Sequence, residues 1–339
     1  MKVIKTEEAI GKVIAHDITE IVPGVFKGIG FKKGHIIQPG DVEKLLRLGK
    51  EHIYVFELDE DNIHEDDAAI ALGNKICGEG VYFEEPPKEG KINILAQRKG
   101  YLKINKEILD EVNDFGDVSI ATIHGNRIVT AGEKLAGCRI IPLTIKKEKL
   151  DKMLNIISQP IIEVKALKSK DAAIITTGSE VYKGRITDKF TPVIKEKLRL
   201  YDSRAIFEKI VPDDTTIIRD SILEAKAKGA QLIVVTGGMS VDPDDKTPGG
   251  IKATGAEIIS YGSPVLPGSM ILLAYLDEIP IFGLPGCVMY NKTTAFDLLL
   301  PKVFIDEKIK RKDITSLGYG GLCLNCDICV FPNCSFAKG

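Results

Sequence analysis

Four glycine-rich turns, each after a short apolar or β-branched run, are the segments of this chain best suited to bind an anionic ligand. Glycine lets the backbone approach a ligand closely, and such turns place N–H groups at strand ends, where open parallel sheets bind anions. Acidic residues lie between them. The turns are Thr177-Gly178-Ser179-Glu180, Thr236-Gly237-Gly238-Met239-Ser240, Leu266-Pro267-Gly268-Ser269 and Leu284-Pro285-Gly286.

An acidic segment follows the second turn and ends at Thr247-Pro248, a pair that predicts the start of a helix. Carboxylates beside a phosphate site favour Mg²⁺, a hard cation that bridges acid and phosphate oxygens. Asp188 is a further candidate ligand and fits a helix cap equally well. The charged residues of the segment are Asp242, Asp244, Asp245 and Lys246.

The C-terminal end carries a second group of chemically active residues. Its cysteines have the spacing C-x₂-C-x₂-C-x₄-C, and two-residue spacers let successive thiolates converge on one metal. The run is similar to the bacterial ferredoxin pattern, with a last spacer one residue longer, so an iron–sulfur cluster and Zn²⁺ both stay open. The predicted metal ligands are Cys323, Cys326, Cys329 and Cys334.

The elements that must position the glycine turns alternate between strand and helix over residues 168–312. This alternation predicts an α/β domain with a mostly parallel sheet covered on both faces. We expect strands at residues 172–177, 204–211, 231–236, 257–260 and 279–284. We expect helices at residues 188–200, 213–228, 248–254, 269–276 and 288–300.

The remaining chain divides into two further parts. Residues 1–165 predict a mixed α+β N-terminal region, with helices near residues 41–49, 63–78 and 146–158 and several short β segments. Residues 313–339 form the short Cys-rich tail. We therefore expect three parts, of which the middle one, residues 168–312, carries the ligand site.

The charge and hydropathy of the chain exclude some classes of function. The chain has 339 residues and a net charge of −2, so no basic field favours nucleic acid or an anionic membrane surface. No apolar run approaches the roughly 20 residues that span a bilayer, and the N-terminus lacks the apolar core of a signal peptide. We expect a cytoplasmic protein with a small-molecule ligand.

Residues 170–304 resemble the molybdopterin-binding domain shared by molybdopterin adenylyltransferases and molybdopterin molybdenumtransferases. The resemblance implies a three-layer α/β/α domain that binds molybdopterin or its adenylated form. The N-terminal region favours the molybdenumtransferases, which carry extra domains before the binding domain. The matching segments, in the order of the family, are residues 177–180, 184–188, 211–214, 236–238, 245–248 and 284–286.

The resemblance implies a reaction in which molybdate is inserted into adenylated molybdopterin and AMP is released, with Mg²⁺. We expect Asp245, Asp188 and Lys246 to be catalytic, through electrostatic stabilisation and without a covalent nucleophile. It also implies a homo-oligomer. The expected ligand-binding residues are Thr177, Gly178, Ser179, Glu180, Thr236, Gly237, Gly238, Ser240, Asp242, Pro285 and Gly286.

Three turns depart from the family pattern and keep two other functions open. Asp188 is followed by Lys189-Phe190, Met239 stands where the family has Thr or Ser, and Cys287 stands where it has Asn or Ser. The first alternative is a non-catalytic carrier or sensor of the cofactor that serves a molybdoenzyme through the cysteine tail. The second is adenylyl transfer to molybdopterin.

Overall fold

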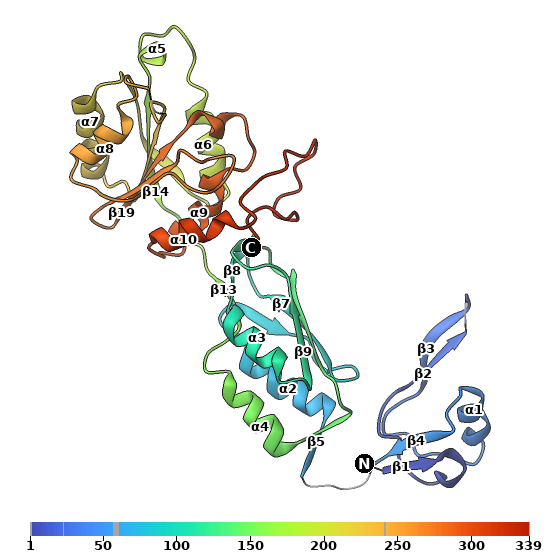
Figure 1. Cartoon of the computed structure of the whole chain (residues 1–339). Coiled ribbons are helices and arrows are strands. Elements are labelled where there is room, and N and C mark those ends of the chain that lie inside the picture. The colour runs from blue at the N-terminus through green and yellow to red at the C-terminus, as the bar shows by residue number, and fades with distance from the viewer. Residues whose placement is uncertain (1, 23, 57–60, 241, 339) are drawn as a thin grey trace. The chain divides into compact units, whose positions relative to one another are not determined.

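The computed structural model describes residues 2–22, 24–56, 61–240 and 242–338 (Figure 1). The chain divides into two compact units. The first contains residues 1–98, 103–123 and 130–164, and the second contains residues 99–102, 124–129 and 165–339. Among the described residues, no helix is both long enough and apolar enough to cross a membrane.

A six-stranded sheet forms the centre of the second unit. Five strands point in one direction and β18 is reversed, because β18 pairs antiparallel with both neighbours and the other pairings are parallel. The prediction of a mostly parallel sheet is confirmed. In order, the strands are β15 (Arg204–Val211), β14 (Asp171–Thr177), β16 (Leu232–Thr236), β19 (Ile279–Leu284), β18 (Leu272–Leu276) and β17 (Glu257–Tyr261).

Helices cover both faces of this sheet and confirm the three-layer prediction. On β14, Ile174 belongs to a buried apolar cluster with Ile194, whereas its neighbour Ile175 belongs to another cluster with Ile218. Successive strand side chains point to opposite faces, which explains the two clusters. Figure 1 shows α6 (Phe190–Arg199) and α9 (Ala295–Val303) on one face and α7 (Thr215–Ala227) and α8 (Thr247–Ala253) on the other.

The helix expected at residues 269–276 is wrong, because Leu272–Leu276 forms strand β18. All five side chains of this strand are buried. A continuous apolar run has no periodicity that separates a buried strand from a buried helix. Asp277, with a left-handed φ of 54°, lies in the turn between β18 and its antiparallel partner β19.

The helix expected at residues 288–300 is only partly correct. Gly286–Met289 forms a short 3₁₀ turn, η2, and α9 begins at Ala295. The later start has a local cause. Thr294 and Asp297 form a reciprocal capping box, in which each side chain accepts the backbone N–H of the other residue.

The first unit mixes helices with small antiparallel sheets, as expected. Its main sheet has the order β6 (Val81–Phe83), β7 (Lys91–Ala96), β11 (Lys134–Ile140) and β9 (Val118–Thr122), and α2 (Glu65–Ile76) lies against β7 and β11. The other helices are η1 (Thr6–Glu8), α1 (Asp41–Arg47), α3 (Lys106–Asp114) and α4 (Lys147–Ile156).

Short strand pairs complete the described structure. They are β1 (Lys2–Lys5) with β4 (His52–Val55), β2 (Ile18–Val22) with β3 (Phe26–Phe31), β5 (Asn62–His64) with β12 (Thr144–Lys146), and β8 (Gly100–Ile104) with β10 (Arg127–Val129). Strand β13 (Ile162–Lys165) belongs to the same sheet as β8 and β10, whose order is β10-β8-β13.

The C-terminal tail is attached to the second unit at both of its ends. It follows α10 (Arg311–Thr315) and η3 (Ser316–Gly318). The N–H of Cys323 donates to the carbonyl of Leu266 at 2.8 Å, and Phe336 is buried in the core beside α9. The segment between these two anchors, which holds the other three cysteines, is mostly exposed.

Candidate functional site

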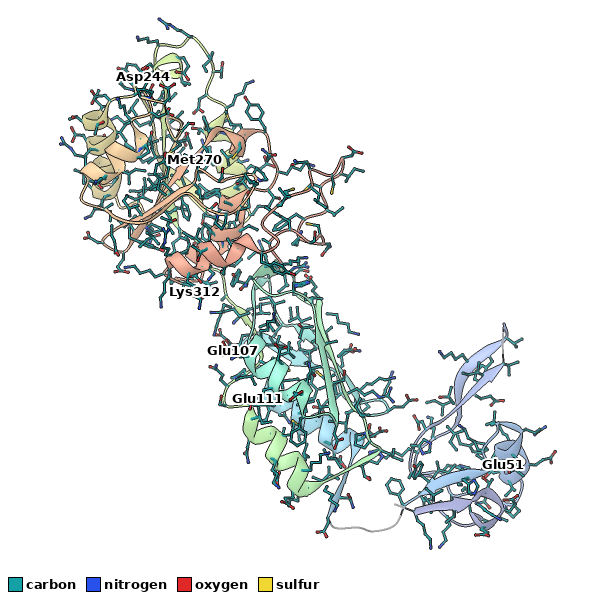
Figure 2. All side chains as sticks on the ribbon, in the orientation of Figure 1. Glu51, Glu107, Glu111, Asp244, Met270 and Lys312 are labelled. Carbon is teal, nitrogen blue, oxygen red and sulfur yellow. The ribbon has the colours of Figure 1, made fainter. Side chains whose placement is uncertain are left out.

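A pocket of about 950 Å³ lies at the carboxyl ends of β14, β16 and β19. The turns after these strands line it together with the acidic loop, residues 242–246, from which three carboxylates reach the pocket. Asp244 and Met270, which both line it, are labelled in Figure 2. Its size is at the upper end of the range for small-molecule sites, roughly 300–1,000 Å³.

The end of β14 directs two threonines to opposite sides of the sheet. The Oγ1 atom of Thr177 lies 3.0 Å from Oγ1 of Thr247, the buried first residue of α8, and Thr177 lines the pocket. Thr176 faces the other side and donates to Asp188 Oδ2 at 3.1 Å. Gly178 then turns the chain with a φ of 144° into α5 (Ser179–Tyr182).

The turn after β16 requires both of its glycines. Gly237 has a φ of 86°, and a Cβ there would lie 2.3 Å from the carbonyl oxygen of Thr177. Gly238 has a φ of 52°, and a Cβ there would lie 3.1 Å from Thr247 Oγ1. The glycines therefore let the turn pack directly against the ends of β14 and α8.

Tyr261 on the edge strand β17 holds this turn from outside. Its hydroxyl donates to the carbonyl of Met239 at 2.9 Å and to that of Ser240 at 3.3 Å. Burial, together with the charge of Asp245, raises the pKa of Tyr261. Sequence reasoning missed this residue, because no local pattern connects it to a turn about 20 residues earlier.

Met239 lines the pocket but has no polar side-chain group to offer a ligand. It is buried within the apolar cluster under α7 and α8, next to Gly283. The departure from Thr or Ser at this position therefore adds core packing. Ser240, the next residue, lines the pocket.

The acidic loop is ordered by its own backbone. Asp242 Oδ1 accepts the N–H of Asp244 at 3.0 Å, and the Asp242 carbonyl accepts the N–H of Asp245 at 2.9 Å. Asp245 is half-buried and the other two carboxylates are exposed. Lys246 does not line the pocket, since its amine donates to the carbonyl of Pro243 in the same loop.

Asp188 does not line the pocket and uses both carboxylate oxygens within the fold. Oδ1 accepts the N–H groups of Phe190 at 2.7 Å and Thr191 at 3.2 Å, which are in the first turn of α6. Oδ2 accepts the hydroxyls of Thr176 and Thr191, at 3.1 and 2.5 Å. This set of bonds is that of a helix cap tied to the end of β14.

Two other predicted residues, Ser179 and Thr236, do not line the pocket and form hydrogen bonds within the fold. The N–H of Ser179 donates to Asp213 Oδ2 at 2.7 Å, and buried Thr236 donates to Thr176 at 3.4 Å. The predicted residues that the structure brings together as pocket lining are Thr177, Gly178, Glu180, Gly237, Gly238, Ser240, Asp242, Asp245, Pro285 and Gly286.

Several lining residues were not predicted from the sequence. Asp213 fixes the start of α5 and reaches the pocket, whereas its neighbour Asp214 caps α7 by accepting two N–H groups at 2.9 Å. Lys189 is the only lysine or arginine among the described lining residues. The signal for Asp213 was its position at the end of a predicted strand. The others are Val181, Ile186, Thr187, Phe190, Met239, Asp244, Met270, Met289 and Tyr290.

The pocket has an excess of negative charge. Five carboxylates line it, from Glu180, Asp213, Asp242, Asp244 and Asp245, against one amine. A phosphate-bearing ligand would meet repulsion from these groups unless a cation lay between them. Mg²⁺ fits this donor set, because it is commonly held by one or two carboxylates and by phosphate oxygens of the substrate.

Among the described residues, no three or more His, Cys, Asp or Glu side chains lie together in a way that could hold a metal ion. The tail cysteines are free thiols and all four line a second pocket, of about 280 Å³, against residues 290–293. Their predicted role as metal ligands stays a prediction.

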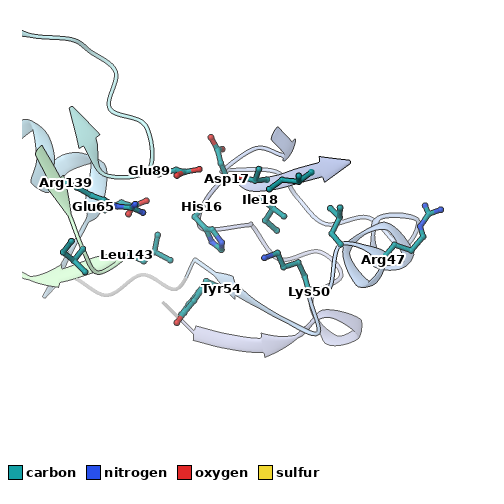
Figure 3. Close-up of a pocket in the computed structure, with 14 residues that line it drawn as sticks. His16, Asp17, Ile18, Arg47, Lys50, Tyr54, Glu65, Glu89, Arg139 and Leu143 are labelled. Atoms are coloured by element: carbon teal, nitrogen blue, oxygen red, sulfur yellow. The ribbon is translucent and has the colours of Figure 1, made fainter. Parts of the chain in front are cut away.

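The first unit contains a separate pocket of about 660 Å³ (Figure 3). His16 lies in it, and within the described structure its Nδ1 atom is buried without a hydrogen-bond partner. Burial lowers the pKa of His16 and, with the charge of Asp66, raises the pKa of Glu65 to about 7. Arg47, Lys50 and Arg139 bring positive charge to the same pocket.

Two family models match this chain. Residues 173–304 match one described as a probable molybdopterin binding domain, and residues 3–57 match one described as a domain of unknown function. The first match covers the large sheet, except the first two residues of β14, and every turn that lines the pocket of the second unit.

Curated relatives of known name also match part of the chain. A molybdopterin molybdenumtransferase of Staphylococcus aureus is 30% identical over 131 residues, which cover 37% of this chain and 31% of that one. The match thus spans about a third of that relative's length. A molybdopterin adenylyltransferase of Pyrococcus furiosus is 28% identical over 154 residues, which cover 41% of this chain and 90% of that one.

Among solved structures, the chain is similar to the tungsten cofactor synthesizing protein MoaB of Pyrococcus furiosus. The identity is 25%, the match covers 41% of this chain and 95% of that one, and the TM-score is 0.34.

Proposed function

We propose that this chain binds adenylated molybdopterin and inserts molybdate with release of AMP, starting from the premise that residues 173–304 belong to the molybdopterin-binding domain family. The observation that carries the proposal is the pocket in which three glycine turns and the acidic loop of this domain meet. Its position at the carboxyl ends of parallel strands is where open α/β sheets bind their ligands.

The side chains around the pocket define what the chain would contribute. Asp245 and Asp242 would hold Mg²⁺, while the hydroxyls of Thr177 and Ser240 offer hydrogen bonds to a polar ligand. When bound, Mg²⁺ would neutralise phosphate charge and polarise the phosphoanhydride. Lys246 would contribute positive charge from the start of α8. Asp188 supports the site through α6 and the end of β14.

Two alternatives have support of their own. A carrier or sensor is favoured by Cys287 in the last turn and by the cysteine tail. An adenylyltransferase is favoured by the P. furiosus relative, most of whose length the match covers. The first predicts binding without turnover, and the second predicts nucleotide transfer to molybdopterin without a need for molybdate.

One assay separates these functions: AMP release from adenylated molybdopterin, with and without molybdate and Mg²⁺. The proposal expects release that requires both and that falls about 100-fold in Asp245→Asn, the size of effect typical of losing one electrostatic contact in the transition state. Asp220→Asn, an exposed change on α7, is the matched control and should retain release. Binding without release would contradict insertion and favour the carrier.

The proposal also covers the organisation of the chain. Residues 168–312 would carry the ligand site, residues 1–165 would be an accessory region, and residues 313–339 would be a metal-binding tail that contacts a molybdoenzyme. We further propose a homo-oligomer. Sedimentation velocity of the full chain should give a mass of at least two chains, and a monomer at all concentrations would contradict this part.

A further inference from the structure

We infer that the four tail cysteines form a single site for a thiophilic metal centre, either a Zn²⁺ ion or an iron–sulfur cluster, at the margin of the ligand pocket. The metal site stands independently of the proposed function, whereas its relation to pterin binding rests on that function. The shared chemistry is coordination by four thiolates, which both kinds of centre accept.

The first observation is that the cysteines surround one space. Cys323, Cys326, Cys329 and Cys334 all line the same pocket of about 280 Å³. A water molecule occupies about 30 Å³ in the liquid, so this space is large enough for a multi-atom cluster as well as for a single ion. The structure thus places all four cysteines around a single space, as a shared metal site requires.

The second observation is that the fold fixes the ends of the cysteine segment. Leu266 bonds twice to the start of this segment: its N–H donates to the carbonyl of Gly321 and its carbonyl accepts the N–H of Cys323, each at 2.8 Å. Near the end of the chain, the N–H of Ala337 donates to Gly320 at 2.9 Å, and Phe336 is buried. The segment therefore forms a closed loop attached to the domain.

The sulfur atoms line the pocket without meeting as a ligand group in this structure. The exposed side chains of Cys326 and Cys329 would rotate inward on binding, and Cys329 Sγ already lies 4.0 Å from Thr293 Oγ1 on the pocket wall. Each thiol that binds loses its proton to solvent, so the bound metal replaces the protons of the four thiols.

Cations near the pocket would offset the negative charge of four thiolates. Lys292 lines the pocket. Arg127 donates to Asn333 Oδ1 at 2.9 Å, and the amine of Lys338 donates to the carbonyl of Pro332. Asn333 and Pro332 immediately precede Cys334, so both cations lie near one predicted ligand.

The metal pocket and the ligand pocket share a wall. Tyr290 lines both, and the residues that follow it, up to Thr293, form one side of the cysteine pocket. A metal centre held there would contact the segment that follows the turn Leu284-Pro285-Gly286. Binding of the metal and of the pterin ligand should therefore affect one another through Tyr290.

The test measures metal content and a local optical signal in the full chain. Anaerobically purified protein is analysed for zinc, iron and sulfide, and metal-free protein is titrated with Zn²⁺ or reconstituted with Fe²⁺ and sulfide. We expect about one centre per chain with one of the two treatments. The double variant Cys326→Ser/Cys329→Ser should lose at least 90% of it, whereas Cys77→Ser, outside the tail, should retain it.

The chain contains no tryptophan, so Tyr290→Trp supplies a single fluorescent reporter on the shared wall. Its emission should change on metal loading, whereas that of Tyr82→Trp, on β6 of the first unit, should not. Failure to bind either kind of centre, or full metal content in the double variant, would overturn the metal site. If metal binds but the emission of Tyr290→Trp does not change, the placement of the metal centre beside Tyr290 would be wrong. Neither result depends on pterin turnover.

Discussion

From its sequence context, Asp188 could be either a Mg²⁺ ligand or a helix cap. In the structure its hydrogen bonds are those of a helix cap. Its oxygens accept four hydrogen bonds, two from the first turn of α6 and two from threonine hydroxyls. We predict that Asp188→Ala lowers the free energy of unfolding by about 1–2 kcal/mol, the usual cost of losing a helix cap. Urea denaturation measures this change.

Asp220→Ala is the control for that experiment, because Asp220 is an exposed carboxylate on α7 whose ion-pair partner is its neighbour Arg219. Its effect should stay within about 0.5 kcal/mol, as is usual for surface positions. If Asp188→Ala left stability unchanged while it abolished Mg²⁺-dependent activity, the metal-ligand interpretation of Asp188 would be correct and the cap interpretation wrong.

Glu65 gives the first unit a predicted dependence on pH. Burial raises the pKa of Glu65 from 4.5 to about 7, so the folded state binds its proton more tightly than the unfolded state does. The resulting stabilisation is fully present below pH 4.5 and is lost as the pH rises through about 7. We predict that Glu65→Gln removes this part of the pH dependence.

The measurement compares unfolding free energies of the wild type and Glu65→Gln across this pH interval. Their difference should change steadily between the two pKa values and become constant above the higher one. Glu84→Gln, an exposed change in the same unit, should follow the wild type. A constant difference between wild type and Glu65→Gln at every pH would show that Glu65 has an ordinary pKa.

At the scale of elements, the turn after β16 depends on a strand at the edge of the sheet. The hydroxyl of Tyr261 donates to the carbonyls of Met239 and Ser240. We predict that Tyr261→Phe weakens pterin binding about three- to tenfold, because each lost hydrogen bond is worth about 0.5–1.5 kcal/mol and Ser240 would no longer be fixed. Isothermal titration with adenylated molybdopterin measures the affinity.

Tyr82→Phe, at an exposed position of β6, is the matched loss of a tyrosine hydroxyl outside the second unit and should leave the affinity unchanged. If Tyr261→Phe bound the ligand as tightly as the wild type, the turn would be held by its glycines and by Met239 in the core alone.

The sequence could predict elements where periodicity and turn residues agree, as for β14, β16, β19 and the helices between them. It could not place β18, whose five buried residues carry no periodicity, and it did not detect the capping box at Thr294 that delays α9. The first error arises because a fully buried apolar run fits a strand and a helix equally well, and the second because a local capping box sets the start of the helix.

At the scale of the whole molecule, the site was predictable where it follows from topology. Turns after parallel strands must meet at one edge of the sheet, so Thr177, Gly237 and Gly286 could be grouped without coordinates. Contacts made by the side chains could not be predicted. Asp188 turns to α6, Lys246 bonds to its own loop, and Tyr261 arrives from a distant strand.

The central claim, that the pocket of the second unit binds the pterin nucleotide, is tested most directly by filling it. Gly286 lines the pocket, and a Cβ there would meet nothing closer than Met289 Cε at 4.0 Å. Its φ is also outside the left-handed region. Gly286→Phe should therefore fold normally and occupy the pocket with its ring. Gly137→Phe, on β11, is the matched control, because a Cβ there would also be in open space.

The measurement is the affinity for adenylated molybdopterin by isothermal titration, with thermal unfolding recorded for each variant. We predict that Gly286→Phe weakens binding by at least about 100-fold, or roughly 3 kcal/mol, at an unchanged melting temperature, and that Gly137→Phe binds like the wild type. Wild-type affinity in a folded Gly286→Phe variant would contradict the account, as would a wild-type chain that does not bind the nucleotide.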